Sequence, residues 1–178
     1  MILRILICLS LMTTSAFAID WSLDPDHSTL TFEGTQGGVP FQGSFERFSA
    51  NISLDPDDLP SASISVTIET ASAISGSAER DGTLPSADWF DVASHPEATF
   101  TSTTVNRTDS GYLAEGTLTL KGTSQATSLP FTLDITDDAA HATGTLTLDR
   151  SDYNVGTGAL SPMVGAEVAV SFDITATR

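Results

Sequence analysis

Apolar and polar residues alternate with a period of two along most of this chain. In the segment 63–70, the apolar residues Ile64, Val66 and Ile68 alternate with the polar residues Ser65, Thr67 and Glu69. The same alternation recurs in further segments: 30–32, 39–54, 112–120, 129–135, 146–148 and 168–174. Successive side chains of a β-strand point to opposite faces, so the pattern predicts strands with one buried face and one face in water. We expect about eight such strands.

Short polar segments rich in aspartate, glycine and proline separate the expected strands, as in 24–26, 36–38 and 55–58. These residues favour tight turns. Strands joined by short turns pair antiparallel, because a parallel pair needs a crossover of a dozen residues or more. The sequence therefore predicts an all-β domain, either an eight-stranded antiparallel barrel or a two-sheet sandwich. The barrel is favoured because closure leaves no unpaired strand edge.

Two segments interrupt the alternation. The apolar residues change parity between Phe45 and Phe48, which predicts a bulge that bends a long strand. The segment 75–96 lacks strand character, and a connection of this length in a compact domain is more often functional than idle. Within the 76–96 connection we expect a short helix at 86–92 with Ser86 at its N-cap. We interpret this segment as a cap at the rim of the barrel.

The first 18 residues have the features of an export signal. Arg4 precedes an apolar run too short to span a bilayer, and Ala16-Phe17-Ala18 has the small-x-small pattern that signal peptidase reads. We predict cleavage after Ala18, which leaves one exported domain, residues 19–178, without stable membrane insertion. The single cysteine, Cys8, would leave with the signal, so neither a disulfide nor a thiolate metal site is expected.

The chain is strongly acidic, with 23 aspartates and glutamates against 7 lysines and arginines and a net charge of −16. A surface of this sign repels phosphate groups, which excludes nucleic acid as a partner.

No arrangement of residues typical of catalysis or metal binding is found. The three histidines, His27, His95 and His141, lie in separate parts of the sequence and lack the spacings that converge on a metal ion. Neither a G-x-S-x-G motif nor a phosphate-binding glycine loop is present. The sequence therefore predicts a binding protein, with no catalytic residue, metal or catalytic cofactor.

Two arginines are candidates for buried charges. Arg150 continues the inward parity of 146–148, and Arg80 lies beside Asp81 in the long irregular segment. A buried guanidinium needs a carboxylate or a ligand oxygen beside it, because an unpaired buried charge is very costly. Both explanations stay open: a polar ligand head group, or structural pairs with the carboxylates Asp81, Asp149 or Asp152.

Seven motifs, in order along nearly the whole expected domain, resemble those of the YceI-like family of exported lipid-binding proteins. The motifs are Trp21-x-Leu23-Asp24-Pro25-x-His27-Ser28 leading to Phe32, Gly43-x-Phe45-x-x-Phe48, Arg80-Asp81-x-x-Leu84, Trp89-Phe90-Asp91-Val92, His95-Pro96-x-Ala98-x-Phe100-x-Ser102, Gly116-x-Leu118-Thr119-Leu120-x-Gly122, and Arg150-x-Asp152-Tyr153. The chain departs from the family pattern at Lys121, where a histidine is usual, and at Thr123-Ser124-Gln125.

The resemblance implies a lipocalin-like barrel around an apolar tunnel that holds a polyisoprenoid chain, such as a quinone tail or a prenyl phosphate. It also implies a periplasmic carrier or storage protein, sometimes associated with a cytochrome b561-type membrane protein. The alternative is a β-sandwich interaction module without a lipid ligand. An eight-stranded barrel is at the size where the interior either fills or holds one small ligand. With the inward parity, this resemblance predicts the ligand-binding residues Leu30, Phe32, Phe41, Phe45, Ile64, Val66, Ile68, Arg80, Trp89, Phe90, Phe100, Leu118, Leu120, Leu146, Arg150, Val170 and Phe172.

Overall fold

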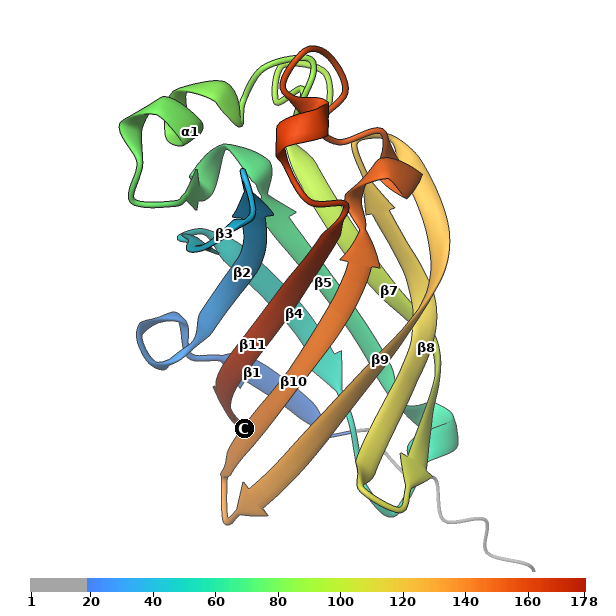
Figure 1. The fold of residues 1–178 in the computed structure, drawn as a ribbon. Coiled ribbons are helices and arrows are strands. Elements are labelled where there is room, and N and C mark those ends of the chain that lie inside the picture. Colours follow the sequence, from blue (N-terminus) through green and yellow to red (C-terminus); the bar gives the residue numbers. More distant parts are fainter. Residues whose placement is uncertain (1–18) are drawn as a thin grey trace, which may run out of the picture.

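The computed structural model describes residues 19–178, so the predicted export signal and Cys8 lie outside the described part. Eleven strands form one antiparallel sheet that curves round on itself (Figure 1). The strands are β1 (Asp20–Leu23), β2 (Thr29–Gln36), β3 (Val39–Phe45), β4 (Phe48–Ser53), β5 (Ser63–Glu69), β6 (Ala73–Ile74), β7 (Glu97–Thr108), β8 (Gly111–Leu120), β9 (Thr123–Thr136), β10 (Ala139–Asp149) and β11 (Glu167–Thr177). The helices are α1 (Ala78–Thr83) and five 3-10 turns, η1 (Pro25–His27), η2 (Leu59–Ser61), η3 (Thr70–Ser72), η4 (Arg150–Tyr153) and η5 (Ser161–Met163).

Three of the barrel staves are each made of two consecutive strands. The 3-10 turn η1 separates β1 from β2, yet both pair with β11, at Leu23↔Ala176 and Thr29↔Asp173. In the same way β3 and β4 follow one another, as do β5 and β6, so that β3 pairs with β6 and β4 pairs with β5. When each of these three pairs is counted as one long strand, the described strands form an eight-stranded antiparallel barrel. Strand β11 closes the barrel by pairing with β1 and β2. The barrel prediction is confirmed, and the sandwich alternative is wrong.

The bend expected near Phe45 is a break between β3 and β4 at residues 46–47. Phe45 before it and Phe48 after it both face the interior, as the change of parity requires. Ser72 holds the break in place: its carbonyl accepts from the Glu46 amide at 3.1 Å and its hydroxyl from the Arg47 amide at 3.1 Å. Because Ser72 is fully buried, these bonds fix the bend within the wall of the barrel.

The short helix of the 76–96 connection is present, but not at 86–92 as expected. It is α1, which begins after Ser77 and ends before Pro85, with Glu79 and Asp81 favourably placed in its first turn. Residues 86–92 form turns instead, and Asp91 has a φ of 48°. The chain folds back because the Phe90 amide bonds to the Leu84 carbonyl at 3.0 Å, which buries Phe90. Burial of this ring therefore outweighs the local capping signal.

The two ends of the barrel differ. One end carries the cap, formed by the segments 75–96 and 150–166 (Figure 1). The two segments are joined at the Asp88 carbonyl, which accepts from the amides of Gly156 at 2.8 Å and Thr157 at 2.9 Å. At the other end, Tyr112 and Phe131 stack with ring centres 5.3 Å apart, and buried side chains close the interior. In residues 19–178 no helix has the length and apolar character needed to cross a membrane.

Candidate functional site

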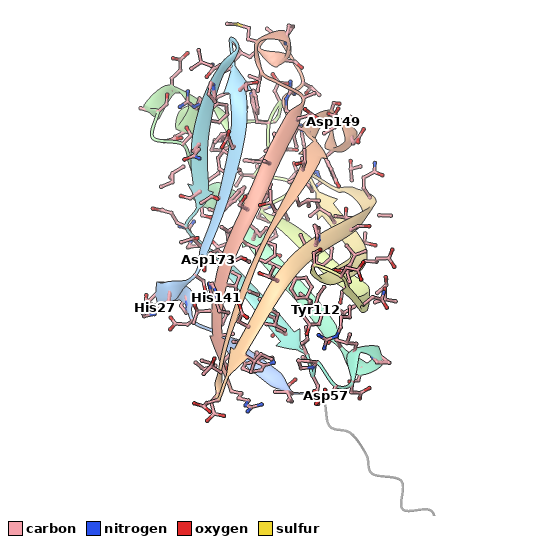
Figure 2. All side chains as sticks on the ribbon, turned by 60° about the horizontal axis from the view of Figure 1, so that its bottom comes forward. His27, Asp57, Tyr112, His141, Asp149 and Asp173 are labelled. Atoms are coloured by element: carbon pink, nitrogen blue, oxygen red, sulfur yellow. The ribbon has the colours of Figure 1, made fainter. Side chains whose placement is uncertain are left out.

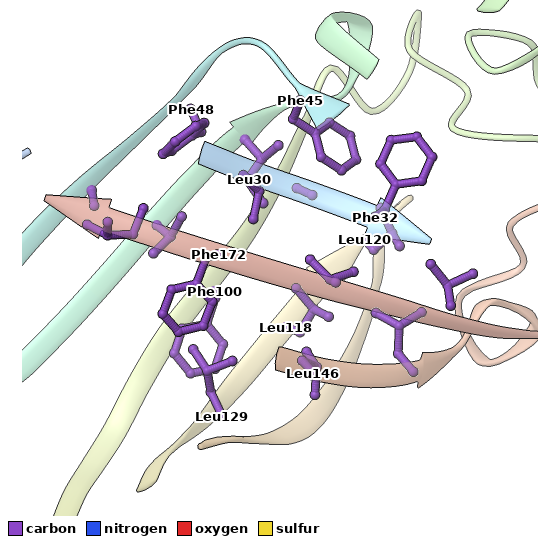
Figure 3. A pocket seen from close by; sticks show the side chains of 18 of the residues that line it. Leu30, Phe32, Phe45, Phe48, Phe100, Leu118, Leu120, Leu129, Leu146 and Phe172 are labelled. Atoms are coloured by element: carbon purple, nitrogen blue, oxygen red, sulfur yellow. The ribbon is translucent and has the colours of Figure 1, made fainter. Parts of the chain in front are cut away.

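The interior of the barrel contains a long cavity with a volume of about 250 Å³ (Figure 3). Its wall runs from Trp89 in the cap to Trp21 and Ala176 near the opposite end. On β10 alone the lining extends from Ala140 to Leu148, which is about 27 Å of strand at 3.4 Å per residue. The cavity is therefore a tunnel shaped for a long, narrow molecule.

The wall of the tunnel is apolar along its whole length. Arg150 is the only charged residue among those that line it, and the remaining side chains are aliphatic or aromatic, apart from the side-chain-free Gly34. The indole N–H of Trp21 donates to the Leu54 carbonyl at 2.9 Å. Water needs two to four polar partners to stay in an internal cavity, and this wall does not supply them. The tunnel suits a hydrocarbon chain.

Glycines in the wall explain why an aromatic-rich interior stays open. Three phenylalanines pair across the ladder with a glycine: Phe32 with Gly43, Phe41 with Gly34, and Phe172 with Gly144. A Cβ atom on Gly43 would lie only 2.3 Å from the Phe32 ring, and one on Gly144 only 2.5 Å from the Phe172 ring. Each ring therefore lies directly over its glycine, an arrangement that also compensates for the missing side chain. The rings cover the wall and leave the centre of the barrel free.

The structure brings together in this tunnel all of the predicted ligand-binding residues except Arg80. They are Leu30, Phe32, Phe41, Phe45, Ile64, Val66, Ile68, Trp89, Phe90, Phe100, Leu118, Leu120, Leu146, Arg150, Val170 and Phe172. Their contact with a ligand stays a prediction.

Several lining residues were missing from the sequence-based set. Leu129, Phe131 and Leu133 of β9 follow the same alternation and could have been included. Trp21 was not predicted because the 3-10 turn η1 lies between β1 and β2, and the inward positions change from odd numbers before this turn to even numbers after it. Leu84 and Val164 come from the cap, where no periodic signal exists.

Arg150 is a structural residue of the cap. Its guanidinium is buried and all five of its N–H groups donate to the loop that follows: Nε to the Gly165 carbonyl at 2.8 Å, Nη1 to Val155 and Gly156, and Nη2 to Ser161 and Val164. The carboxylate partner expected from the sequence is wrong, because backbone carbonyls take its place. The guanidinium also lies 5.7 Å from the centre of the Trp89 ring. No donor of Arg150 is left for a ligand head group.

Arg80 lies outside the tunnel, on α1. Its Nε donates to the Ser75 hydroxyl at 3.1 Å and its Nη1 to the Gln36 side-chain oxygen at 3.1 Å. It does not form the expected direct pair with Asp81. Instead Asp81 accepts from the Ser75 hydroxyl at 2.6 Å, so that Ser75 lies between the two charges.

The histidines lie away from the tunnel. The ring of His27 bonds to Asp24 at 2.9 Å, and that of His141 to Asp173 at 2.8 Å, both on the outer surface (Figure 2). The hydrogen bond from His27 lowers the pKa of the Asp24 carboxyl. Within residues 19–178 no group of three or more histidine, cysteine, aspartate or glutamate side chains is placed to hold a metal ion.

Comparison with known proteins agrees with this architecture. The YceI-like domain family matches residues 21–176. The chain belongs to the YceI-like family. A UPF0312 protein of Pseudomonas putida is 31% identical over 166 residues, which are 87% of this chain and 86% of the relative. A UPF0312 protein of Pectobacterium atrosepticum is 35% identical over 118 residues, and the match spans only 62% of that relative's length.

Two solved structures have the same fold. BcnA of Burkholderia cenocepacia superposes with a TM-score of 0.82 at 32% identity, over 87% of this chain and 99% of that chain. A polyisoprenoid binding domain from Saccharophagus degradans has a TM-score of 0.69 at 20% identity, over 91% of this chain and 99% of that chain. At that identity the second likeness shows the fold alone.

Proposed function

We propose that this YceI-like protein binds a long-chain polyisoprenoid lipid, of the quinone or prenyl phosphate type, in the barrel tunnel. The observation that carries the proposal is a tunnel with about 27 Å of lining strand and no polar group free to bind water. The polyisoprenoid-binding name of the Saccharophagus degradans domain, which shares the fold, supports it. The protein would store or carry the lipid in the periplasm after loss of residues 1–18.

The tunnel has enough apolar surface to hold a lipid tail without covalent chemistry. About 27 Å of tunnel accommodates roughly 20 carbons of extended chain, which at roughly 0.3 kcal/mol per atom would contribute about 6 kcal/mol, or an affinity of some tens of micromolar before any head-group contact. The tunnel wall presents no nucleophile or general base, which favours binding over catalysis. A cytochrome b561-type membrane protein as the delivery partner rests on the family resemblance alone.

Mass spectrometry of an organic extract of the purified protein tests the proposal. Leu120 lines the tunnel, whereas its neighbour Thr119 bonds to Ser124 on the outside of the barrel at 2.8 Å. We expect a polyisoprenoid in extracts of the wild-type protein and of Thr119→Asp, and none in extracts of Leu120→Asp, because a carboxylate in the apolar tunnel would have to be desolvated.

Phe100→Leu separates binding from folding in the same experiment. It keeps the wall apolar while changing its shape, and we expect a weaker hold on the lipid with the barrel intact. Wild-type protein that yields no lipid and takes up none from added polyprenols would contradict the proposal. Retention of the same lipid by folded Leu120→Asp would contradict it as well.

A further inference from the structure

A second, smaller hollow of about 40 Å³ lies at the cap end of the tunnel. The two spaces share Phe41, Leu84, Trp89 and Val164 as lining residues, so they adjoin one another. We call the smaller hollow the vestibule, because the side chains that border it also border the tunnel at its cap end. Unlike the tunnel, the vestibule is partly polar.

The polar side of the vestibule is formed by Gln36, Glu79, Arg80 and Thr83. Arg80 is held in a fixed position there: beside its bonds to Ser75 and Gln36, its guanidinium lies 4.5 Å from the centre of the Phe41 ring. Nη2 donates to the Ser75 carbonyl at 3.3 Å. These three bonds use three of the five N–H groups of a guanidinium, so two remain to donate to a ligand. The Gln36 amide, whose oxygen accepts from Arg80, can donate as well.

Carboxylates offset the positive charge of Arg80. Glu79 lines the vestibule, and Asp81 is linked to the guanidinium through Ser75. Two further cations lie near the cap: Arg150 has all its donors bound to carbonyls, and Lys121 donates to the Asn154 carbonyl at 2.7 Å. The whole chain carries a net charge of −16. A phosphate brings a charge of about −1.5 to −2 and is repelled by neighbouring carboxylates. The vestibule therefore offers hydrogen-bond donors without an excess of positive charge.

We propose that the vestibule is the head-group site for the lipid in the tunnel, and that it selects an uncharged head with hydrogen-bond-accepting oxygens over a phosphate. The inference rests on the proposed function and decides between the two head-group types that it leaves open. Arg80 and Gln36 would donate to the carbonyl or hydroxyl oxygens of the head while the tail lies in the tunnel.

The experiment compares three ligands with tails of equal length: geranylgeraniol, geranylgeranyl phosphate and the hydrocarbon phytane. Binding to delipidated protein is followed by tryptophan fluorescence, because the two tryptophans of the sequence, Trp21 and Trp89, line opposite ends of the tunnel. We expect the alcohol to bind more tightly than the phosphate by about tenfold.

Arg80→Met, which removes the donors but keeps much of the apolar stem, should weaken alcohol binding by about tenfold. It should leave phytane binding unchanged. Arg107→Met is the matched control, because Arg107 also lies over an aromatic ring, that of Tyr112 at 4.9 Å, but at the closed end. Glu79→Gln, which removes a carboxylate from the vestibule, should improve phosphate binding.

Two results would overturn the inference while leaving the proposed function intact: phosphate bound as tightly as alcohol by the wild type, or an equal loss of alcohol and phytane binding in Arg80→Met. If Arg80→Met does not fold, Glu79→Gln and the wild-type preference still decide. Failure of all three ligands to bind would instead refute the proposed function, and the inference with it.

Discussion

Arg150 shows how a buried charge can be satisfied without a counter-ion. Backbone carbonyls carry partial negative charge, and five of them surround this guanidinium. The planar fork of arginine donates in five fixed directions, which lysine cannot reproduce with three rotating donors. The shape of the loop from Val155 to Gly165 therefore depends on this one side chain.

Replacement of Arg150 should destabilise the barrel strongly. We expect Arg150→Met to cost about 3 kcal/mol, because it leaves buried carbonyls without donors, and to lower Tm by roughly 6–12 °C. Arg150→Lys should also destabilise the protein, but by less than Arg150→Met, because lysine keeps only some of the donors. Arg47→Met is the control: Arg47 pairs with Glu69 on the surface, and such pairs contribute at most about 1 kcal/mol. Thermal unfolding provides the measurement, and an Arg150→Lys variant as stable as the wild type would contradict the structural role.

The pair of Gly34 and Phe41 allows the tunnel to be narrowed without breaking its wall. A Cβ atom on Gly34 would meet only the Phe41 ring, at 3.2 Å, and no backbone atom. Gly34→Ala should therefore push the ring toward the tunnel and weaken lipid binding several-fold, or by about 1 kcal/mol. Folding stability should stay equal or rise by up to about 1 kcal/mol.

Gly82→Ala is the control for this change, because nothing lies within 4 Å of the added methyl group. It should leave binding unchanged. Fluorescence titration and urea unfolding on both variants separate the two effects. Equal binding by Gly34→Ala and the wild type would show that the Phe41 ring does not limit the width of the tunnel.

At the scale of elements, η4 begins at a capping residue that titrates. The Asp149 side chain accepts from the hydroxyl and the amide of Ser151, and these bonds, with a smaller effect of Arg150, lower the pKa of the Asp149 carboxyl. A lowered pKa in the folded state stabilises the protein above the usual aspartate range. This contribution is lost as the pH falls through the lowered value.

Asp149→Asn tests this pH dependence. Asparagine caps a helix as well as aspartate does but does not titrate in this range. We expect the wild type to be slightly more stable than the variant near pH 6, and the difference to shrink as the pH falls below about 4 toward the lowered pKa of Asp149. Thermal unfolding from pH 6 to pH 3 measures it. The other carboxylates are common to both proteins and cancel, so a constant difference would contradict the assignment.

The strands could be predicted from the sequence because the polarity of each residue in a strand indicates whether its side chain faces the interior or the solvent. Val66 and Leu118 lie on inward positions and the alternation around them places whole strands. The cap could not be predicted in the same way. Its helix formed around Arg80, not at 86–92, because the burial of Phe90 decides the path of the chain and is a long-range contact. The carbonyl partners of Arg150 could not be predicted either, because every residue carries a backbone carbonyl and the side-chain sequence does not show which of them a buried arginine will contact.

For the molecule as a whole, the barrel has one polar and one closed end. The vestibule lies beside the cap, and stacked Tyr112 and Phe131 close the opposite end. The proposed head-group site would give a lipid with an oxygen-bearing head one favourable orientation, with its tail toward Trp21. A sequence pattern of alternating residues fixes the barrel but does not distinguish its two ends, because both ends of every strand alternate alike.

The dry tunnel should also make the protein unusually responsive to hydrostatic pressure. Unfolding collapses internal voids, so the change in volume on unfolding is negative and scales with the void removed, within a usual range of about −20 to −100 mL/mol. With a void of about 250 Å³, the empty protein should lie near the large end of that range. A bound lipid fills the space, so lipid-loaded protein should need a higher pressure to unfold and show a smaller volume change. Pressure, which hardly affects a well-filled barrel, would thus report directly whether the tunnel is occupied.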